Sequence, residues 1–150
     1  MKKMLLLGSV LMLASGYSEA ARLYMKKTYS LFNSTGSFEL TCRFYSNKVE
    51  ITERVNGTSS SLRVVPTTYS GATLSSLVSR ASTNTYRSEP FNICDGGSAS
   101  VRAYRASGSS FTLMKFEDCG ATKNFRSGPS SLRLRQIAEQ YCESFMPTVK

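Results

Sequence analysis

The sequence contains no histidine and no tryptophan, and only 10 of its 150 residues are acidic. Without histidine the chain cannot form a Ser-His-Asp triad, a Cys-His pair, a histidine-ligated zinc site or a pair of catalytic histidines. The four cysteines include no C-x-x-C pair, and the sequence has neither an Asp-x-Asx-x-Asx calcium run nor a glycine-rich phosphate loop before a helix. We therefore expect no metal site and no cofactor.

Long apolar runs are scarce as well. No apolar segment approaches the roughly twenty residues that a transmembrane helix needs. The main apolar run, residues 4–13, follows Met1-Lys2-Lys3 and leads to Ser18-Glu19-Ala20. A charged start, a short apolar run and small residues before a cleavage point are typical of a secretory signal peptide. The pattern predicts a signal peptide over residues 1–20 and one secreted or periplasmic domain over residues 21–150, without a transmembrane segment.

Paired carboxylates are the catalytic groups that need no histidine. The candidates in this sequence are Glu50, Glu53, Asp95, Glu117 and Asp118. Glu50 and Glu53 lie in one predicted strand, where pairing with a basic residue on a neighbouring strand is the usual role of a carboxylate. Serine and lysine can also form a nucleophile and a base, but serine is too frequent here for any such pair to be informative. We expect that the protein is not an enzyme.

Four cysteines, an even number, follow the predicted signal peptide: Cys42, Cys94, Cys119 and Cys142. This count predicts two disulfides formed in an oxidising compartment. Four cysteines allow three pairings, and sequence alone does not select one. A C-terminal helix that returns over the second hairpin favours Cys42 with Cys94 and Cys119 with Cys142.

Alternating apolar and polar residues predict a β-meander in the first half of the domain. The predicted strands cover residues 37–45, 49–55 and 62–65. The first alternates strictly, with one face formed by Phe38, Leu40, Cys42 and Phe44. Residues 21–36 precede this pattern, and we expect them to form a flexible basic lead.

The second half combines helices with another hairpin. Helical spacing of apolar residues predicts a short helix over residues 72–80 and a longer one from Pro129 to Met146, while residues 98–106 and 110–117 alternate as strands. Residues 82–89 form a polar stretch, followed by a short extended piece at Phe91 and Ile93. In the last strand, Phe111 and Leu113 are expected on one face and Met114 and Phe116 on the other. The pattern predicts an α+β fold, an antiparallel sheet with both helices packed on one face.

The chain is basic, with a formal net charge of +9. Residues 1–20 carry one net positive charge, so +8 remains on the predicted domain. An exported basic protein is expected to meet anionic partners, although charge can also serve solubility alone.

The pattern Arg-x-Tyr occurs twice on predicted polar strand faces, at Arg43 with Tyr45 and at Arg102 with Tyr104. An arginine beside an aromatic ring can hold an anionic group while the ring stacks on a sugar or a base. If the final helix begins near the second hairpin, this anion-binding face would extend to Arg105, Arg126, Arg133 and Arg135. The alternative is a solvated face, on which cation–π and cross-strand pairs hold the arginines.

Two functions are compatible with these features. The first is a protein-interaction module, such as an inhibitor, an immunity factor or an envelope assembly component, and it predicts an exposed apolar patch around Met114 and Phe116. The second is a binder of an anionic polymer, such as a cell-wall glycan, lipopolysaccharide or nucleic acid, through the arginine and tyrosine side chains.

Overall fold

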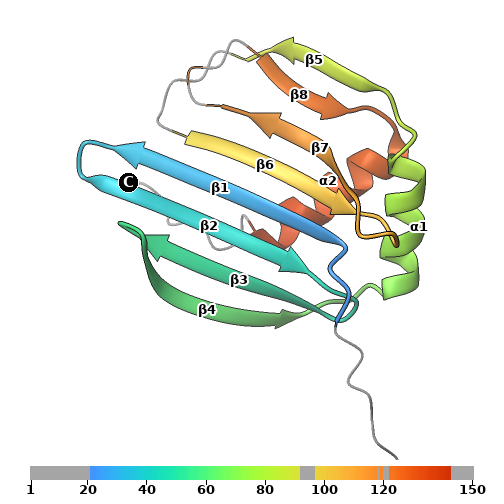
Figure 1. Ribbon diagram of the computed structural model, residues 1–150, viewed down its shortest axis with the longest axis horizontal. Coiled ribbons are helices and arrows are strands. Elements are labelled where there is room, and N and C mark those ends of the chain that lie inside the picture. Colours follow the sequence, from blue (N-terminus) through green and yellow to red (C-terminus); the bar gives the residue numbers. More distant parts are fainter. Residues whose placement is uncertain (1–20, 92–96, 118, 120–121, 143–150) are drawn as a thin grey trace, which may run out of the picture.

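The computed structural model describes residues 21–91, 97–117, 119 and 122–142. Within these residues, eight antiparallel strands form one sheet, and two helices lie on one side of it (Figure 1). This architecture confirms the predicted α+β class. The elements in chain order are β1 (Met25–Asn33), β2 (Gly36–Phe44), β3 (Lys48–Val55), β4 (Thr58–Pro66), α1 (Gly71–Ala81), β5 (Tyr86–Pro90), β6 (Gly97–Tyr104), β7 (Ser110–Phe116), β8 (Thr122–Arg126) and α2 (Pro129–Cys142).

The strands follow the order β4-β3-β2-β1-β6-β7-β8-β5 across the sheet. The first four strands form a meander, and α1 connects its outer strand β4 to β5 at the opposite edge. β1 lies inside the sheet, paired with β2 on one side and with β6 on the other.

The expectation of a flexible lead over residues 21–36 is therefore wrong, because residues 25–33 form the strand β1. The misleading feature is Lys27, which lies between Met25 and Tyr29 on the face of β1 that the helices cover and is only 3% exposed. A lysine at a core-facing position breaks the apolar alternation by which strands are usually detected.

The predicted strands of the two hairpins are confirmed by β2, β3, β4, β6 and β7, but the expected placement of Met114 and Phe116 on the face opposite to Phe111 is wrong. Val101 pairs with Met114 and Arg102 pairs with Thr112, so Leu113 is an extra residue in a β-bulge. One extra residue reverses the alternation beyond it. Phe111, Met114 and Phe116 consequently share the helix-covered face.

Both strands at the β5 edge were absent from the sequence prediction. β5 falls in the predicted polar stretch 82–89 and all of its residues are exposed, while β8 has no buried residue. Strands with so little burial carry no apolar alternation. Of the predicted extended piece, Phe91 follows β5 and Ile93 lies outside the described residues.

The helices agree with the prediction where the structure describes them. The Ser70 side chain caps α1 by accepting a hydrogen bond from the backbone N–H of Thr73 at 3.2 Å, and Pro129 begins α2. The expected apolar stripe of α2 is buried at Leu134, Ile137, Ala138 and Tyr141. The predicted extension to Met146 lies outside the described residues. Both helices pack into one core with the sheet, and α1 contacts α2.

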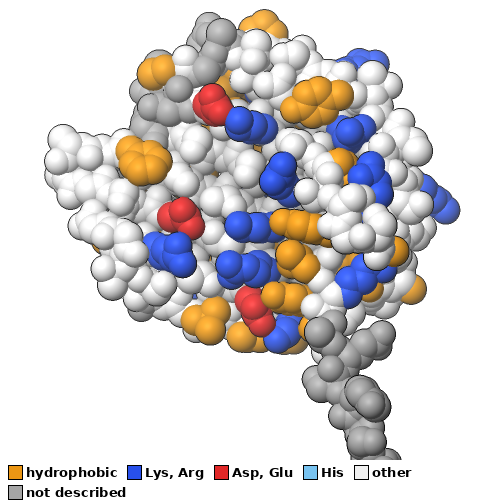
Figure 2. Space-filling model, in the orientation of Figure 1, with side chains coloured by type: hydrophobic (Ala, Val, Ile, Leu, Met, Phe, Trp, Pro, Cys, Tyr) orange, Lys and Arg blue, Asp and Glu red, His pale blue; other side chains and the backbone are white. Residues whose placement is uncertain are grey.

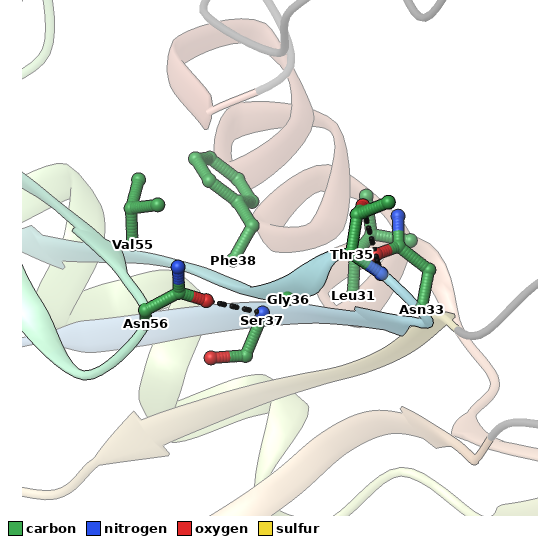
Figure 3. Close-up of a pocket in the computed structure, with 8 residues that line it drawn as sticks. All are labelled: Leu31, Asn33, Thr35, Gly36, Ser37, Phe38, Val55 and Asn56. Atoms are coloured by element: carbon green, nitrogen blue, oxygen red, sulfur yellow. Dashed lines mark hydrogen bonds between the residues drawn. The ribbon is translucent and has the colours of Figure 1, made fainter.

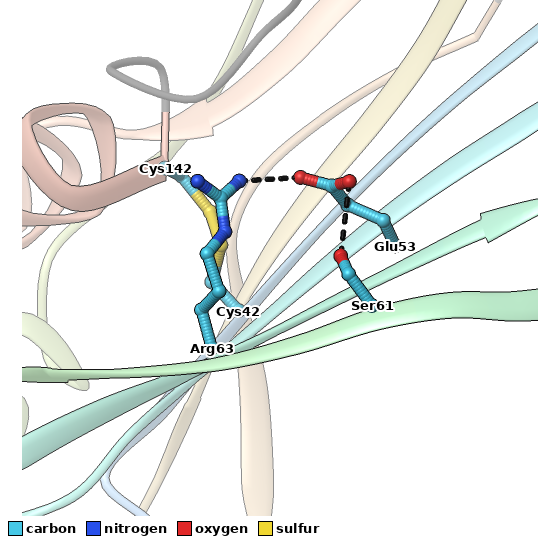
Figure 4. Close-up of polar contacts among 5 residues, drawn as sticks. All are labelled: Cys42, Glu53, Ser61, Arg63 and Cys142. Carbon is cyan, nitrogen blue, oxygen red and sulfur yellow. Dashed lines mark hydrogen bonds and ion pairs between the residues drawn. A yellow bond between two sulfur atoms is a disulfide. The ribbon is translucent and has the colours of Figure 1, made fainter.

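A disulfide joins Cys42 of β2 to Cys142 of α2, with 6.3 Å between their Cα atoms (Figure 4). The predicted pairs Cys42–Cys94 and Cys119–Cys142 are therefore wrong. Cys42 points to the helix-covered face, and Cys142, the last described residue of α2, lies over it, which no local pattern reveals. Cys119 is also disulfide-bonded, and Cys94 lies outside the described residues.

Candidate functional site

One face of the sheet carries the core and the helices, and the opposite face is open among the described residues (Figure 1). Side chains alternate between the two faces along each strand. Met25, Cys42 and Val101 are core residues of β1, β2 and β6. The residue after each of them, Lys26, Arg43 and Arg102, therefore points to the open face.

Strand register places these three basic residues side by side. Lys26 pairs with Arg43 on β2 and with Arg102 on β6, so the three form a line across neighbouring strands that we term the basic row. Facing residues on adjacent strands have Cβ atoms about 5 Å apart. Figure 2 views the open face and shows lysine and arginine side chains in a band across it, with hydrophobic side chains beside the band.

The nearest acidic residue in this line already has partners. Glu50 pairs with Arg43 in the register, but its carboxylate accepts a hydrogen bond from Lys48 Nζ at 2.8 Å. That hydrogen bond is the main cause of the lowered pKa of Glu50 and of the raised pKa of Lys48. Arg43 contributes only a smaller electrostatic attraction to Glu50.

Among the residues that the structure describes, no ion pair or side-chain hydrogen bond engages the three side chains of the basic row. Lys26 and Arg43 are half-buried and Arg102 is exposed. Like charges that face each other on adjacent strands destabilise a sheet. The basic row therefore opposes folding slightly, and an anion placed between its members would offset that repulsion.

Both Arg-x-Tyr pairs border β1, as their places in the register require. The Tyr24 N–H donates to the Phe44 carbonyl at 2.9 Å, and the Tyr104 N–H donates to the Tyr24 carbonyl at 2.9 Å. Tyr45 and Tyr104 thus lie beside the basic row at one end of the strands. Burial raises the pKa of Tyr45, with a smaller contribution from Glu50, and Lys48 Nζ lies 5.2 Å from the Tyr45 ring centroid.

On the other side of the basic row, hydroxyl groups line a hollow of about 150 Å³. They come from two cross-strand pairs, Thr28 with Ser100 and Ser30 with Ser98. Lys115 and Glu117, which form an ion pair with each other, also line the hollow. On the open face, the cations therefore lie between Tyr45 and Tyr104 at one end of the strands and the hydroxyls of β1 and β6 on the other side.

Sequence reasoning missed Lys26, the central member of the basic row, because it was placed in a flexible lead. A usable signal was present, since Lys26, Thr28 and Ser30 are polar residues at a spacing of two. Only the pairing of β1 between β2 and β6 shows that this polar face joins the two Arg-x-Tyr pairs.

The other arginines proposed for the anion-binding face are elsewhere. Arg105, after β6, lies over the Phe111 ring at 4.7 Å and donates to Ser109 Oγ at 3.2 Å. Arg133 and Arg135 are on α2, which covers the opposite face, and Arg135 lies 5.0 Å from the Phe125 ring centroid. These residues do not extend the basic row.

Arg126 has a structural role at the β8 end of the sheet. Its guanidinium donates to the backbone carbonyls of Thr112, Ser82 and Asn84, and it lies over the rings of Tyr86 and Phe111. These contacts tie the loop after α1 to β7, so Arg126 is not available to the basic row.

The apolar patch predicted around Met114 and Phe116 is also absent. Met114 is 6% exposed, and Phe116 is partly buried against the core. Exposed apolar side chains occur instead on the edge strand β4, where Leu62 is 67% and Val64 57% exposed.

The described carboxylates considered for catalysis are paired with cations. Glu53 binds Arg63 and accepts a hydrogen bond from Ser61 Oγ at 3.0 Å (Figure 4). Within the described ranges, no group of three or more cysteine, aspartate or glutamate residues is arranged to hold a metal ion. Asp95 and Asp118 lie outside those ranges.

A second hollow, of about 190 Å³, lies at the turn between β1 and β2 (Figure 3). Its polar groups stabilise the turns around it. Asn56 Oδ1 accepts from the Ser37 N–H at 2.9 Å, and Asn33 Oδ1 accepts from both the N–H and the hydroxyl of Thr35. None of its lining residues is charged, so it does not resemble the open face chemically.

Comparisons with protein-family models, with curated proteins and with solved structures found no significant match to this chain. Neither described helix has the length and apolar character required to cross a bilayer.

Proposed function

We propose that this is an exported, non-enzymatic binding protein that holds an anionic ligand on the open face of its sheet. The observation that carries the proposal is the basic row, in which Arg43, Lys26 and Arg102 face one another across three strands and form no ion pair with any described carboxylate. Two unit charges about 4 Å apart in water repel by about 1 kcal/mol, and a ligand anion between them attracts both, which makes the total interaction of the three charges favourable.

Export is part of the proposal. A disulfide between Cys42 and Cys142 is compatible with an extracellular or periplasmic location. The predicted signal peptide over residues 1–20 supports the same location. Anionic polymers available there include cell-wall glycans, lipopolysaccharide and released nucleic acid.

The experiment compares two variants that lose the same charge. The site variant is Lys26→Ala/Arg43→Ala/Arg102→Ala, and the control variant removes three exposed arginines elsewhere, Arg80, Arg87 and Arg133. Retention of oxidised protein is measured on immobilised lipopolysaccharide, peptidoglycan, polyuronate and single-stranded DNA, from low to physiological salt.

We expect the site variant to lose retention at a lower salt concentration than either the wild type or the control variant. Equal loss in both variants would show that total charge, and not the basic row, determines binding. No retention of the wild type on any polyanion would also contradict the proposal.

A second candidate is a protein-interaction module that uses β4. Within the described part of the chain this strand pairs only with β3, and it exposes Leu62 and Val64. An unpaired edge with exposed apolar side chains can add a strand from a partner. Crosslinking in the native envelope tests this candidate, because a Leu62→Lys/Val64→Lys variant should lose a protein adduct that the wild type forms.

A further inference from the structure

The direction of the basic row restricts the shape of its ligand. The row runs across the strands, with one cation on each of β2, β1 and β6. Neighbouring strands are about 4.8 Å apart, so the three backbone positions span about 10 Å in a line. A linear polymer with an anionic group on each short, rigid unit can place successive charges along such a line.

The hydroxyl-lined hollow beside the row supplies a second kind of contact. Thr28 is two residues from Lys26 on β1, and Ser100 is two residues from Arg102 on β6, so each hydroxyl shares the open face with its cation. A hydroxyl can both donate and accept, as the hydroxyls of a sugar do. The hollow has a volume of about 150 Å³.

The aromatic side chains do not form a platform for bases. Tyr45 follows β2 and Tyr104 ends β6, and these strands are two strand spacings, or about 10 Å, apart, while Tyr24 between them is buried in the core. Lys48 Nζ already lies 5.2 Å from the Tyr45 ring centroid. Sequence-tolerant binding of single-stranded nucleic acid depends on successive bases stacking on aromatic rings. Among its described residues, the open face has cations and hydroxyls in rows but no continuous series of rings.

We infer that the ligand of the basic row is an acidic polysaccharide, lying across the strands with its anionic groups on Arg43, Lys26 and Arg102 and a sugar ring in the hydroxyl-lined hollow. This inference rests on the proposed function and specifies the ligand. The anionic group is a carboxylate or a sulfate, both of which arginine binds through paired N–H donors.

The test separates the hydroxyl contacts from the charges. A Thr28→Val/Ser100→Ala variant removes two hydroxyls from the hollow and leaves the basic row intact. Its matched control, Ser76→Ala/Thr122→Val, removes two hydroxyls at exposed positions outside the hollow. Dissociation constants are measured at physiological salt for polygalacturonate, dextran sulfate, neutral dextran and oligothymidylate.

We expect at least one of the two acidic glycans to bind more tightly than oligothymidylate. We expect neutral dextran not to bind. The loss of two hydrogen bonds should weaken acidic glycan binding roughly tenfold in the hollow variant, with no change in the control. The preferred glycan identifies the anionic group as carboxylate or sulfate.

Two results would overturn the inference while leaving the proposed function in place. One is tighter binding of oligothymidylate than of either acidic glycan, with the basic row still required. The other is acidic glycan binding that needs the basic row but is unchanged in the hollow variant. If the basic row proves dispensable for every polyanion, both the inference and the proposed function fail.

Discussion

Removal of the Cys42–Cys142 disulfide measures how strongly the link between β2 and α2 stabilises the fold. The two cysteines are 100 residues apart in the sequence, and both side chains are fully buried. In the chain-entropy model, a crosslink that closes a loop of this length stabilises the folded state by about 4.7 kcal/mol. The disulfide of Cys119 remains and restricts part of the unfolded chain, so we expect a loss of about 3–4 kcal/mol for a Cys42→Ala/Cys142→Ala variant.

The assay is urea unfolding under non-reducing conditions, followed by far-ultraviolet circular dichroism because the chain has no tryptophan. If the crosslink acts by restricting the unfolded chain, its removal also increases the surface exposed on unfolding and hence the m value. The expected result is a lower midpoint together with a larger m value.

A loss below about 1 kcal/mol with an unchanged m value would refute this reasoning, because it would mean that the unfolded chain is equally restricted without the bond. An Ala138→Gly variant serves as a control for packing on α2, since it removes buried volume but leaves the crosslink in place. It should lower the midpoint without raising the m value.

Two further predictions concern a turn and a surface pair. Gly36 has φ 150°, and a Cβ there would collide with Asn56 Oδ1, so Gly36→Ala should lower the free energy of unfolding by about 1–3 kcal/mol. The effect of Gly57→Ala should be smaller, because a Cβ at Gly57 meets no atom. Equal effects of the two substitutions in thermal unfolding would contradict this prediction. The lowered pKa of Glu50, due mainly to its hydrogen bond with Lys48, predicts stability that is present at neutral pH and lost as pH falls below the ordinary value of 4.5. The Glu50→Gln variant should lose less stability over that range than the wild type. The difference in the loss should be less than about 1 kcal/mol because the pair is partly exposed, and identical pH profiles in the two proteins would disprove the contribution of Glu50.

Much of the candidate site was accessible from the sequence, although its centre was not. The two Arg-x-Tyr pairs were identified because strand alternation is a local property that places residues two apart on one face. Lys26 was missed because the core-facing residues of β1 include Lys27. Apolar residues therefore do not recur at every second position of this strand, and the strand was not detected. The basic row exists only when β1 pairs with both β2 and β6, and strand pairing over this distance leaves no local pattern in the chain.

Local periodicity by itself determined the α+β class, the strands β2, β3, β6 and β7, and both helices, because each buries one face at a spacing of two or of three to four residues. Only the tertiary structure decided the order of the strands, the bulge at Leu113, the partner of Cys42 and the line of cations on the open face. These features depend on which segments meet in space. That choice minimises the free energy of the whole chain, and no short window of sequence contains it.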